Sequence, residues 1–364
     1  DTSPAEAEAE EPAPEAADGS YDDEEEEEEE EDGLEQAMSD TDGWIRRQRA
    51  NNVSPEEVLA HLGLRVRFAG DPDELWALVA DLVSQFRTRM LPRPRLPSPS
   101  TLDELAAAIA RAEHILVISG AGISVSAGIP DFRSKSGVYQ MVEEKFDLPD
   151  PQSLFDIHYF VEDPVPFFTF ARNLYPGKYA PTPSHRFIRA LERRGKLLRN
   201  YTQNIDTLEQ VAGIERKVTC HGSFETASCL ACKRRVPCDE IRAEIMRAEV
   251  PRCGACSHDL NVLKPDIVFF GETLGEGFEA HIREDLPRCD LLLVMGSSMR
   301  VQPVATIPSM LARDVPQVLI NRELVMQPHQ FDVELLGECD AITAELARRL
   351  GWAEDVAEAD APAA

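Results

Sequence analysis

The chain has 364 residues, which gives room for two or three domains and a sizeable hydrophobic core. Its formal net charge is −29, but residues 1–42 hold 21 of the Asp and Glu side chains and no Lys or Arg, so the remainder is only mildly acidic. An acidic chain repels phosphate, and no apolar run approaches the roughly 18 residues of a membrane span. We therefore expect neither direct nucleic-acid binding nor a membrane segment.

The first hundred residues divide into three segments of different composition. Residues 1–42 include eight consecutive glutamates, repel themselves and cannot bury apolar surface, so we expect an acidic disordered tail. Residues 43–86 contain the helix-start signals SPEE and DPDE, each ahead of apolar residues at helical spacing, which predict a small helical module. Residues 87–100 contain four prolines and four arginines and are typical of an extended basic linker. A nuclear import signal in this linker is a further hypothesis.

From residue 101 onward, short apolar runs alternate with helical patterns. One helical pattern covers 183–194, between a capping Thr182 and a terminating Gly195, and another covers 341–350. Buried strands that alternate with helices predict an α/β fold with a mostly parallel sheet. The apolar runs lie at residues 115–118, 196–201, 218–220, 267–270, 290–295 and 317–320.

A glycine turn, Gly120-Ala121-Gly122, follows the first apolar run. Such a turn lets the main chain approach a pyrophosphate, and the N–H groups at the start of a following helix favour the negative charge. The third glycine of the common dinucleotide fingerprint is replaced by Val125, so that fingerprint is broken. The continuation at 128–133, GIPDFR, places a rigid proline, a carboxylate, an aromatic ring and a guanidinium close together, which is unlike a plain surface helix.

The cysteines predict a metal site. Two Cys-x-x-Cys pairs, separated by 20 residues, have the spacing of a zinc ribbon. Four sulfur ligands leave no open position for water, so the predicted zinc is structural, and Cys220 and Cys238 are nearby alternative ligands. No secretory signal precedes the pairs, which favours a reducing, intracellular compartment. The four predicted ligands are Cys229, Cys232, Cys253 and Cys256.

Polar side chains follow two of the predicted strands. Gln203, Asn204 and Asp206 come directly after the run at 196–201, and His221-Gly222 follows the run at 218–220. Open α/β sheets bind ligands at the carboxyl ends of their strands, and imidazole can exchange a proton near neutral pH. We therefore expect these side chains at a reacting centre.

Taken together, these motifs resemble the sirtuin family over roughly residues 101–350. The resemblance implies a Rossmann-like, mostly parallel sheet with a smaller helical plus zinc-ribbon domain at about 143–195 and 223–262, the ribbon lying at 229–256. Residues 351–364 would form a second acidic tail. The motifs occur in sirtuin order: Gly-Ala-Gly-Ile-Ser from Gly120, Gly-Ile-Pro-Asp-Phe-Arg from Gly128, Thr-Gln-Asn-Ile-Asp from Thr202, His221-Gly222, the two cysteine pairs, Val-Phe-Phe-Gly-Glu from Val268, Gly-Ser-Ser from Gly296 and Asn-Arg-Glu from Asn321.

The resemblance also implies a role for each matching residue. His221 would be the general base, assisted by Asn204 and Asp206 in the nicotinamide pocket. Val268, Phe270 and Gly271 would border an acyl-lysine tunnel, and the segment 268–272 would pair with the substrate backbone as an added strand. The NAD contacts would be Gly120, Ala121, Gly122, Asp131, Phe132, Arg133, Gln203, Asn204, Asp206, Gly296, Ser297, Ser298, Asn321, Arg322, Glu323 and Cys339.

The implied activity is NAD-dependent removal of acetyl groups from protein lysines, histones included, with nicotinamide, acetyl-ADP-ribose and free lysine as products. The resemblance implies action in the nucleus, with the cytoplasm as a further compartment. Regulatory proteins or small molecules could bind the 43–86 module. Two other hypotheses are an NAD-dependent protein mono-ADP-ribosyltransferase and a non-enzymatic adaptor acting through the zinc ribbon and acidic tail.

Overall fold

The computed structural model describes residues 41–51, 53–61, 73, 75–80, 93–131, 137–146, 148–274, 276–326, 329 and 331–357. The chain forms two compact units, Asp1–Pro92 and Arg93–Ala364. The predicted acidic tail, up to residue 40, lies outside the described residues. None of the helices that the structure describes is long and apolar enough to cross a bilayer.

The first unit contains short helices around a small core. Helix α2 spans Thr41–Ala50 and α3 spans Pro55–His61. The predicted capping box is present, because Glu57 N donates to Ser54 Oγ at 3.2 Å and Ser54 N donates to a Glu57 carboxylate oxygen at 2.7 Å. The described part of residues 43–86 is thus helical and has an apolar core of its own, and the bounds of the module stay a prediction. Its buried apolar side chains are Val58, Leu59, Leu75, Trp76 and Val79.

The second unit is built on a six-stranded parallel sheet with strand order β3-β2-β1-β7-β8-β9. Every side chain of β1, β7 and β8 is buried, as expected for a sheet covered on both faces. The predicted α/β class and mostly parallel sheet are therefore confirmed. The strands are β1 (Ile115–Ser119), β2 (Leu197–Thr202), β3 (Lys217–Thr219), β7 (Leu291–Met295), β8 (Gln317–Asn321) and β9 (Val333–Leu336).

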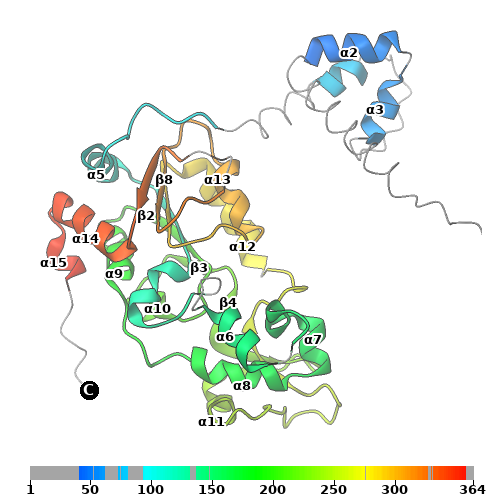
Figure 1. Cartoon of the computed structure of the whole chain (residues 1–364), viewed down its shortest axis with the longest axis vertical. Helices are drawn as coiled ribbons and strands as arrows, with labels where there is room; N and C mark the ends of the chain where they lie inside the picture. Colours follow the sequence, from blue (N-terminus) through cyan, green and yellow to red (C-terminus); the bar gives the residue numbers. More distant parts are fainter. Residues whose placement is uncertain are drawn as a thin grey trace, which may run out of the picture. The chain divides into compact units, whose positions relative to one another are not determined.

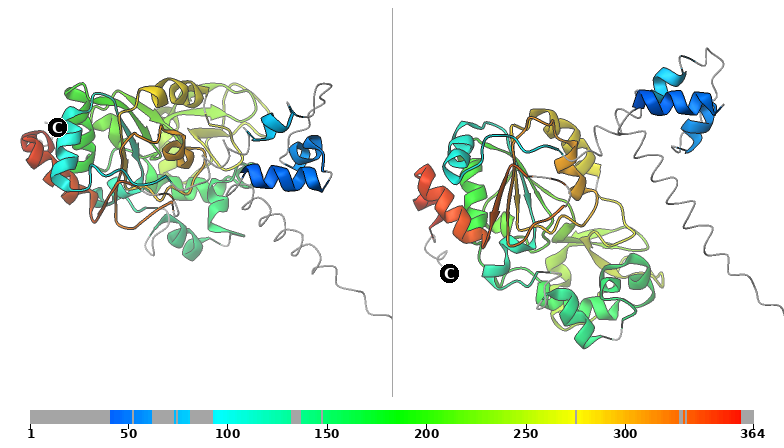
Figure 2. Two further views of the ribbon diagram at one scale, coloured as in Figure 1. Left: turned by 90° about the horizontal axis from the view of Figure 1, so that it is seen from above. Right: turned by 45° about the horizontal axis from the view of Figure 1, so that its top comes forward.

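Helices cover the two faces of this sheet (Figures 1 and 2). Alternate residues of β1 point in opposite directions, so Ile115 and Val117 pack in one core cluster while Leu116 and Ile118 pack in the other. The first cluster is covered by α5 (Leu102–Arg111), α9 (Pro183–Arg193), α14 (Cys339–Leu350) and α15 (Ala353–Val356), and the second by α12 (Glu276–Asp285) and α13 (Ile307–Met310).

A smaller domain has its own core, formed largely by phenylalanines. Phe160, Phe167 and Phe269 pack edge to face, with ring centroids 5.1–5.4 Å apart. Its three-stranded antiparallel sheet has the order β5-β4-β6. Its elements are α6 (Val138–Lys145), α7 (Ile157–Glu162), α8 (Val165–Leu174), β4 (Gly222–Cys229), β5 (Arg235–Pro237), α11 (Arg242–Met246) and β6 (Leu263–Ile267).

The predicted segment boundaries differ from the packing in two places. Phe187, Ile188 and Leu191 of α9 pack in the core of the parallel sheet, so we propose that the first part of the smaller domain is 138–175 rather than 143–195. The predicted tail at 351–364 begins with buried Trp352, over which the Arg194 guanidinium lies at 4.3 Å, and continues into α15. Helix α15 has only four residues, too few to show helical periodicity in the sequence, so its packing is known only from its contacts.

Part of the linker predicted at 87–100 is bound to the second unit through Arg93. Arg93 is 6% exposed, and its guanidinium donates two hydrogen bonds of 2.9 Å to the Asp332 carboxylate and further bonds to the carbonyl oxygens of Val315 and Arg313. Leu96 N also donates to Asp332. Residues 93–100 therefore belong to the second unit, and the basic residue that looked like linker is a buried anchor.

Removal of this anchor is expected to destabilise the second unit. Arg93→Ala leaves the buried Asp332 carboxylate without its cation, which costs about 3 kcal/mol of unfolding free energy. Arg95→Ala is the matched control, because Arg95 pairs with Glu334 but its side chain is 49% exposed, and we expect a cost below about 1 kcal/mol. Urea denaturation of both variants measures the difference. Equal stabilities would show that the buried pair contributes nothing net.

Candidate active site and metal centre

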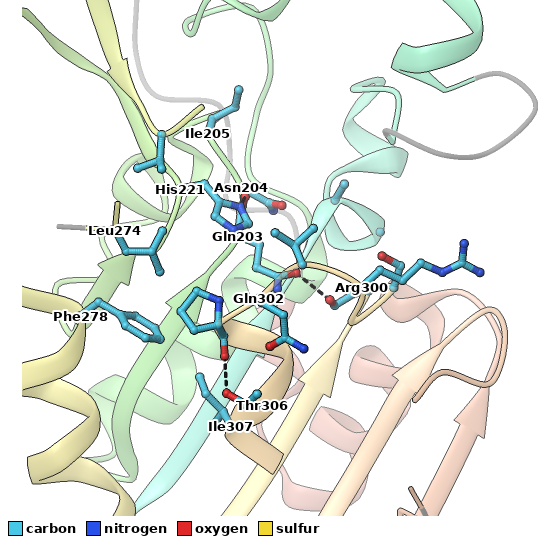
Figure 3. Close-up of a pocket in the computed structure, with 18 of the residues that line it drawn as sticks. Gln203, Asn204, Ile205, His221, Leu274, Phe278, Arg300, Gln302, Thr306 and Ile307 are labelled. Atoms are coloured by element: carbon cyan, nitrogen blue, oxygen red, sulfur yellow. Dashed lines mark hydrogen bonds between the residues drawn. The ribbon is translucent and has the colours of Figure 1, made fainter. Parts of the chain in front are cut away.

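A cavity of about 1680 Å³ lies at the carboxyl ends of β1, β2, β7 and β8 and extends to the segment after β6. Figure 3 shows Gln203, Asn204 and His221 next to one another in this cavity. The following residues from the sequence-based set line it: Ala121, Gly122, Asp131, Gln203, Asn204, His221, Val268, Phe270, Gly271, Gly296, Ser297, Ser298, Asn321, Arg322, Glu323 and Cys339.

Four predicted residues are placed differently or are not described. Gly120 and Asp206 are not among the lining residues; they lie behind Asn204, whose Nδ2 donates to Gly120 O at 3.2 Å. Phe132 and Arg133 lie outside the described residues.

The glycine turn is held against the loop after β7. Gly122 N donates to Gly296 O at 2.8 Å, and a Cβ at Gly122 would lie 2.6 Å from Gly296 Cα. Gly296 has φ 61°, and a Cβ there would lie 2.5 Å from Ile123 N. Only glycines permit this approach, which leaves a stretch of bare main chain at the cavity wall.

The helix predicted after the glycine turn is not an α-helix. Two short 3₁₀ helices, η1 (Ala121–Ile123) and η2 (Val125–Ala127), occupy the segment. Gly128 follows with φ 93°, and Pro130 stands two residues farther on, so no regular helix can continue. The anion-binding expectation therefore rests on the exposed main chain and not on a long helix dipole.

His221 is held in one tautomer by the main chain. Its Nδ1 lies 2.9 Å from Gln203 O, which can only accept, so the ring proton is on Nδ1. Its Nε2 is buried and has no hydrogen-bond partner among the described residues. Burial lowers the pKa of His221 despite this hydrogen bond, so the ring is neutral near pH 7 and Nε2 is a free acceptor. Gly222 (φ 68°) allows the turn, because a Cβ there would overlap Asp266 O.

The polar residues after β2 form a network that the sequence did not show completely. Ser124 Oγ donates to Asp206 Oδ2 at 2.7 Å and accepts from Asn204 Nδ2 at 3.3 Å. Ser297 Oγ donates to Gln203 Oε1 at 2.7 Å, while Gln203 Nε2 is buried without a partner. Ser124 was not assigned a role from sequence, although it is the serine of the Gly-Ala-Gly-Ile-Ser motif.

Residues after β8 and at the start of α14 close the far end of the cavity. Arg322 forms a two-bond ion pair of 2.9 Å with Glu338, a residue that the sequence reasoning missed. Asn321 Nδ2 donates to Glu323 O, which fixes the turn, and Cys339 Sγ lies 3.5 Å from Ile320 O. Burial raises the pKa of the Cys339 thiol to about 12, so it is a neutral packing group.

The segment after β6 is tied to the smaller domain. Phe270 N donates to Phe155 O at 2.7 Å, and Ile157 N donates to Phe270 O at 3.0 Å. Val268 N donates to His221 O at 2.9 Å, which fixes this segment against the general-base candidate. These main-chain groups are already used, so an added substrate strand would have to pair with other groups of 268–272.

The four predicted zinc ligands meet at one point. The Sγ atoms of Cys229, Cys232, Cys253 and Cys256 lie within 4.8 Å of one another. Sγ–Sγ distances of 3.7 Å for Cys229–Cys256 and 3.8 Å for Cys232–Cys253 suit a tetrahedron of thiolates and not disulfides. The cluster therefore fits one structural zinc ion, and Cys220 and Cys238 are not part of it.

Comparison with known proteins accounts for this arrangement. Residues 120–303, from the glycine turn to the loop after β7, match the Sir2 family model. The chain belongs to the Sir2 family. The expected sirtuin resemblance is thus confirmed. The cysteine cluster and most of the cavity lining lie within the matched residues.

Several Sir2-family relatives are similar over most of this chain. The NAD-dependent deacetylase sir2D of Dictyostelium discoideum is 44% identical over 326 residues, covering 85% of this chain and 60% of that protein. The NAD-dependent protein deacetylase sirtuin-1 of Homo sapiens is 51% identical over 284 residues, covering 77% and 37%. The NAD-dependent histone deacetylase sirtuin-1 of Drosophila melanogaster is 45% identical over 340 residues, covering 86% and 40%. The chain thus spans about half the length of the relatives it matches.

Proposed function

We propose that this chain is an NAD-dependent protein lysine deacetylase that yields nicotinamide, acetyl-ADP-ribose and free lysine. The observation that carries the proposal is the neutral His221 ring, whose free Nε2 lies at the junction of the glycine turn, the polar loop after β2 and the Val268 segment. The names of the relatives support the same reaction.

The cavity fits NAD on features of its own. The glycine contact between Gly122 and Gly296 leaves main chain where a pyrophosphate can approach. Gln203 Nε2 and His221 Nε2 are buried polar atoms without partners, which a bound ligand would satisfy. The pyrophosphate and nicotinamide half would contact Ala121, Gly122, Asp131, Gln203 and Asn204, and the adenosine half Gly296, Ser297, Ser298, Asn321, Arg322, Glu323 and Cys339. Gly120 and Asp206 would support this wall from behind, and the contacts of Phe132 and Arg133 stay predictions.

The residues of the chain then have distinct tasks. NAD supplies the ADP-ribosyl group that accepts the acetyl group, with nicotinamide as the leaving group. His221 Nε2 takes a proton from a ribose hydroxyl, a role that requires the neutral ring that burial maintains. Asn204 and Asp206 fix the wall of the nicotinamide pocket through Ser124. The low polarity around Phe269 and Ile267 keeps water from competing as a nucleophile.

Acetyl-lysine would enter beside the segment 268–272. Phe270 is 38% exposed although it is a large aromatic residue, and it lines the cavity together with Val268 and Gly271. An exposed ring at the mouth of an apolar passage suits the aliphatic part of a lysine side chain. We infer that this edge receives acetylated protein segments, including those of histones, as the name of the Drosophila relative suggests. Action on histones would place the protein in the nucleus.

The proposal leaves two alternatives for test. A mono-ADP-ribosyltransferase would use the same cavity, so the two reactions differ only in the group that receives ADP-ribose. The non-enzymatic adaptor is disfavoured by His221 Nε2, which makes no structural hydrogen bond to any described residue. Regulation through the 43–86 module and the absence of direct nucleic-acid binding stay predictions.

The products of a single incubation separate the enzyme hypotheses. With NAD and an acetyl-lysine peptide, we expect acetyl-ADP-ribose in equal amount to deacetylated peptide, and almost no nicotinamide when the acetyl group is absent, because the acetyl oxygen is the nucleophile. Mass spectrometry quantifies acetyl-ADP-ribose, deacetylated peptide, nicotinamide and protein-bound ADP-ribose. Comparable nicotinamide release from unacetylated peptide, together with ADP-ribose bound to protein, would favour the transferase. No NAD consumption in either mixture would favour the adaptor.

A further inference from the structure

A buried polar cluster lies behind the cavity wall that Asn204 forms. A ring nitrogen of His185 and carboxylate oxygens of Asp206 and Glu209 lie within 4.8 Å of one another. His185 is in the first turn of α9, Asp206 follows β2, and Glu209 is in the short helix α10 (Leu208–Val211). Their exposed fractions are 0%, 9% and 2%. The proposed reaction uses Asp206 but assigns nothing to Glu209 or His185.

No cationic side chain among the described residues faces the carboxylates of Asp206 and Glu209. Among the described residues, the titratable groups that face Glu209 are Asp206, the His185 ring and the Cys220 thiol. Burial lowers the pKa of His185 to about 3 and raises that of Cys220, so both are uncharged near pH 7. The charge of Asp340 raises the pKa of His185, and the charge of Arg186 lowers it. Two ionised carboxylates this close in a buried site would repel each other strongly.

The hydrogen bonds distinguish the two carboxyl groups. Asp206 accepts from Ser124 Oγ at 2.7 Å and from Leu208 N at 2.9 Å, one donor for each oxygen. Both bonds favour its ionised form, although burial is the larger effect and raises the pKa of Asp206. Glu209 accepts from Thr202 Oγ1 and, at 3.4 Å, from Ser119 Oγ, both through Oε1. A proton on Glu209 Oε2 would therefore displace neither bond.

His185 provides a second observation on this cluster, an unsatisfied buried ring nitrogen. Its Nδ1 lies 2.8 Å from Thr182 Oγ1, whereas Nε2 is fully buried and meets no hydrogen-bond partner in the part of the chain that the structure describes. A buried nitrogen of this kind is costly unless a donor or acceptor reaches it. The neighbouring carboxyl groups are the polar groups that could do so.

We propose that Glu209 is a positioning residue: it carries a proton that it shares with Asp206, so that Asp206 bears the single negative charge of the pair. The proton fixes Asp206, and Asp206 fixes Ser124 and hence Asn204 at the cavity wall. Burial and the charge of Asp206 raise the pKa of Glu209 to about 7, in agreement with this assignment. The inference rests on the proposed function for its effect on nicotinamide.

Substitution by an uncharged isostere tests the state of Glu209. In Glu209→Gln the amide nitrogen donates as the shared proton would, and the amide oxygen still accepts from Thr202. We expect nicotinamide exchange at pH 7 within about threefold of wild type for Glu209→Gln, and a KM for nicotinamide raised at least about tenfold for Glu209→Ala. Between pH 7 and pH 9 the wild-type KM should rise, while that of Glu209→Gln should stay flat. Glu225→Gln, at an exposed position of β4, is the matched control.

Thermal unfolding tests the same proton without any activity. The pKa of Glu209 is raised in the folded chain above the ordinary value of 4.5, so the folded state binds the extra proton and wild type loses stability as the pH rises from about 4.5 to about 7. Glu209→Gln lacks this loss, so its Tm relative to wild type should increase by about 3 °C or more between pH 5 and pH 8. Glu225→Gln should show no such trend.

Two outcomes would overturn the assignment. Folded Glu209→Gln that loses exchange more than about tenfold at pH 7 would show that an ionised Glu209 is required, as for a bound cation. A Tm difference independent of pH would show that Glu209 carries no shared proton. A wild-type chain that neither deacetylates nor exchanges nicotinamide would instead contradict the proposed function, and the melting comparison would still decide the state of Glu209.

Discussion

His221→Ala is expected to lower the kcat of deacetylation at least about a hundredfold, the usual scale for a lost general base, and to leave the Tm nearly unchanged. The side chain makes one hydrogen bond, from Nδ1 to Gln203 O, and its Nε2 contributes no bond to the fold. Because the ring receives a proton only after NAD has bound, the KM for NAD should change much less than kcat.

The pH dependence of the wild-type kcat should also show the role of His221. Burial lowers the pKa of His221 below the ordinary value of 6.5, so the neutral ring persists as the pH falls through 6.5. The acid limb of kcat should therefore lie below pH 6.5 and be absent in His221→Ala.

His114→Ala is the matched control for His221→Ala, because His114 is half-buried at the opposite end of β1 and outside the cavity lining. It should retain wild-type kcat. Unchanged turnover of His221→Ala, with an unchanged melting curve, would remove His221 from the reaction.

Cys253→Ser is expected to abolish zinc binding and to unfold the zinc ribbon of the smaller domain. A structural zinc ion contributes about 10–16 kcal/mol of apparent binding free energy in small zinc domains at pH 7, and hydroxyl is a poor replacement for thiolate. The antiparallel strands β4 and β6 lead directly into the cysteine pairs, so the loss should spread to the phenylalanine core. Activity should fall because the segment after β6 borders His221.

Metal analysis and circular dichroism measure this effect, with Cys238→Ser as the control. Cys238 is buried near the cluster but is not one of its four ligands, and burial raises the pKa of its thiol to about 12. The control should retain one zinc per chain. Stoichiometric zinc in Cys253→Ser, with none in Cys238→Ser, would place Cys238 in the ligand set instead.

The features that the sequence predicts most directly depend on local residues. The glycine turn, the four cysteines and His221-Gly222 each carry their chemistry in a few consecutive residues or a fixed spacing. The buried strands β1, β2, β7 and β8 were found because a parallel sheet covered on both faces requires short continuous apolar runs, whereas the predicted run at 267–270 begins at the last residue of β6 and is otherwise not a strand. The capping box at Ser54 could be predicted because its two side chains lie three residues apart in the sequence.

Features that depend on contacts between distant residues were missed. Arg93 looked like part of a linker, and only its bonds to Asp332, 239 residues away, show that it is an anchor. Glu338 gave no signal until it was found beside Arg322. The helix α9 has the same amphipathic pattern whether it packs on the parallel sheet or in the smaller domain, so its assignment required the core contacts.

The sequence by itself therefore determined the family, the metal ligands, the general-base candidate and the class of sheet, because each is encoded in short motifs or in periodicity. Only the tertiary structure decided which tautomer His221 adopts, that Asp206 lies behind the cavity wall, and that Glu209 and His185 meet beside it. The physical reason is that burial, hydrogen-bond partners and charge separation set protonation states, and each of these arises from chain segments that meet only when the protein is folded.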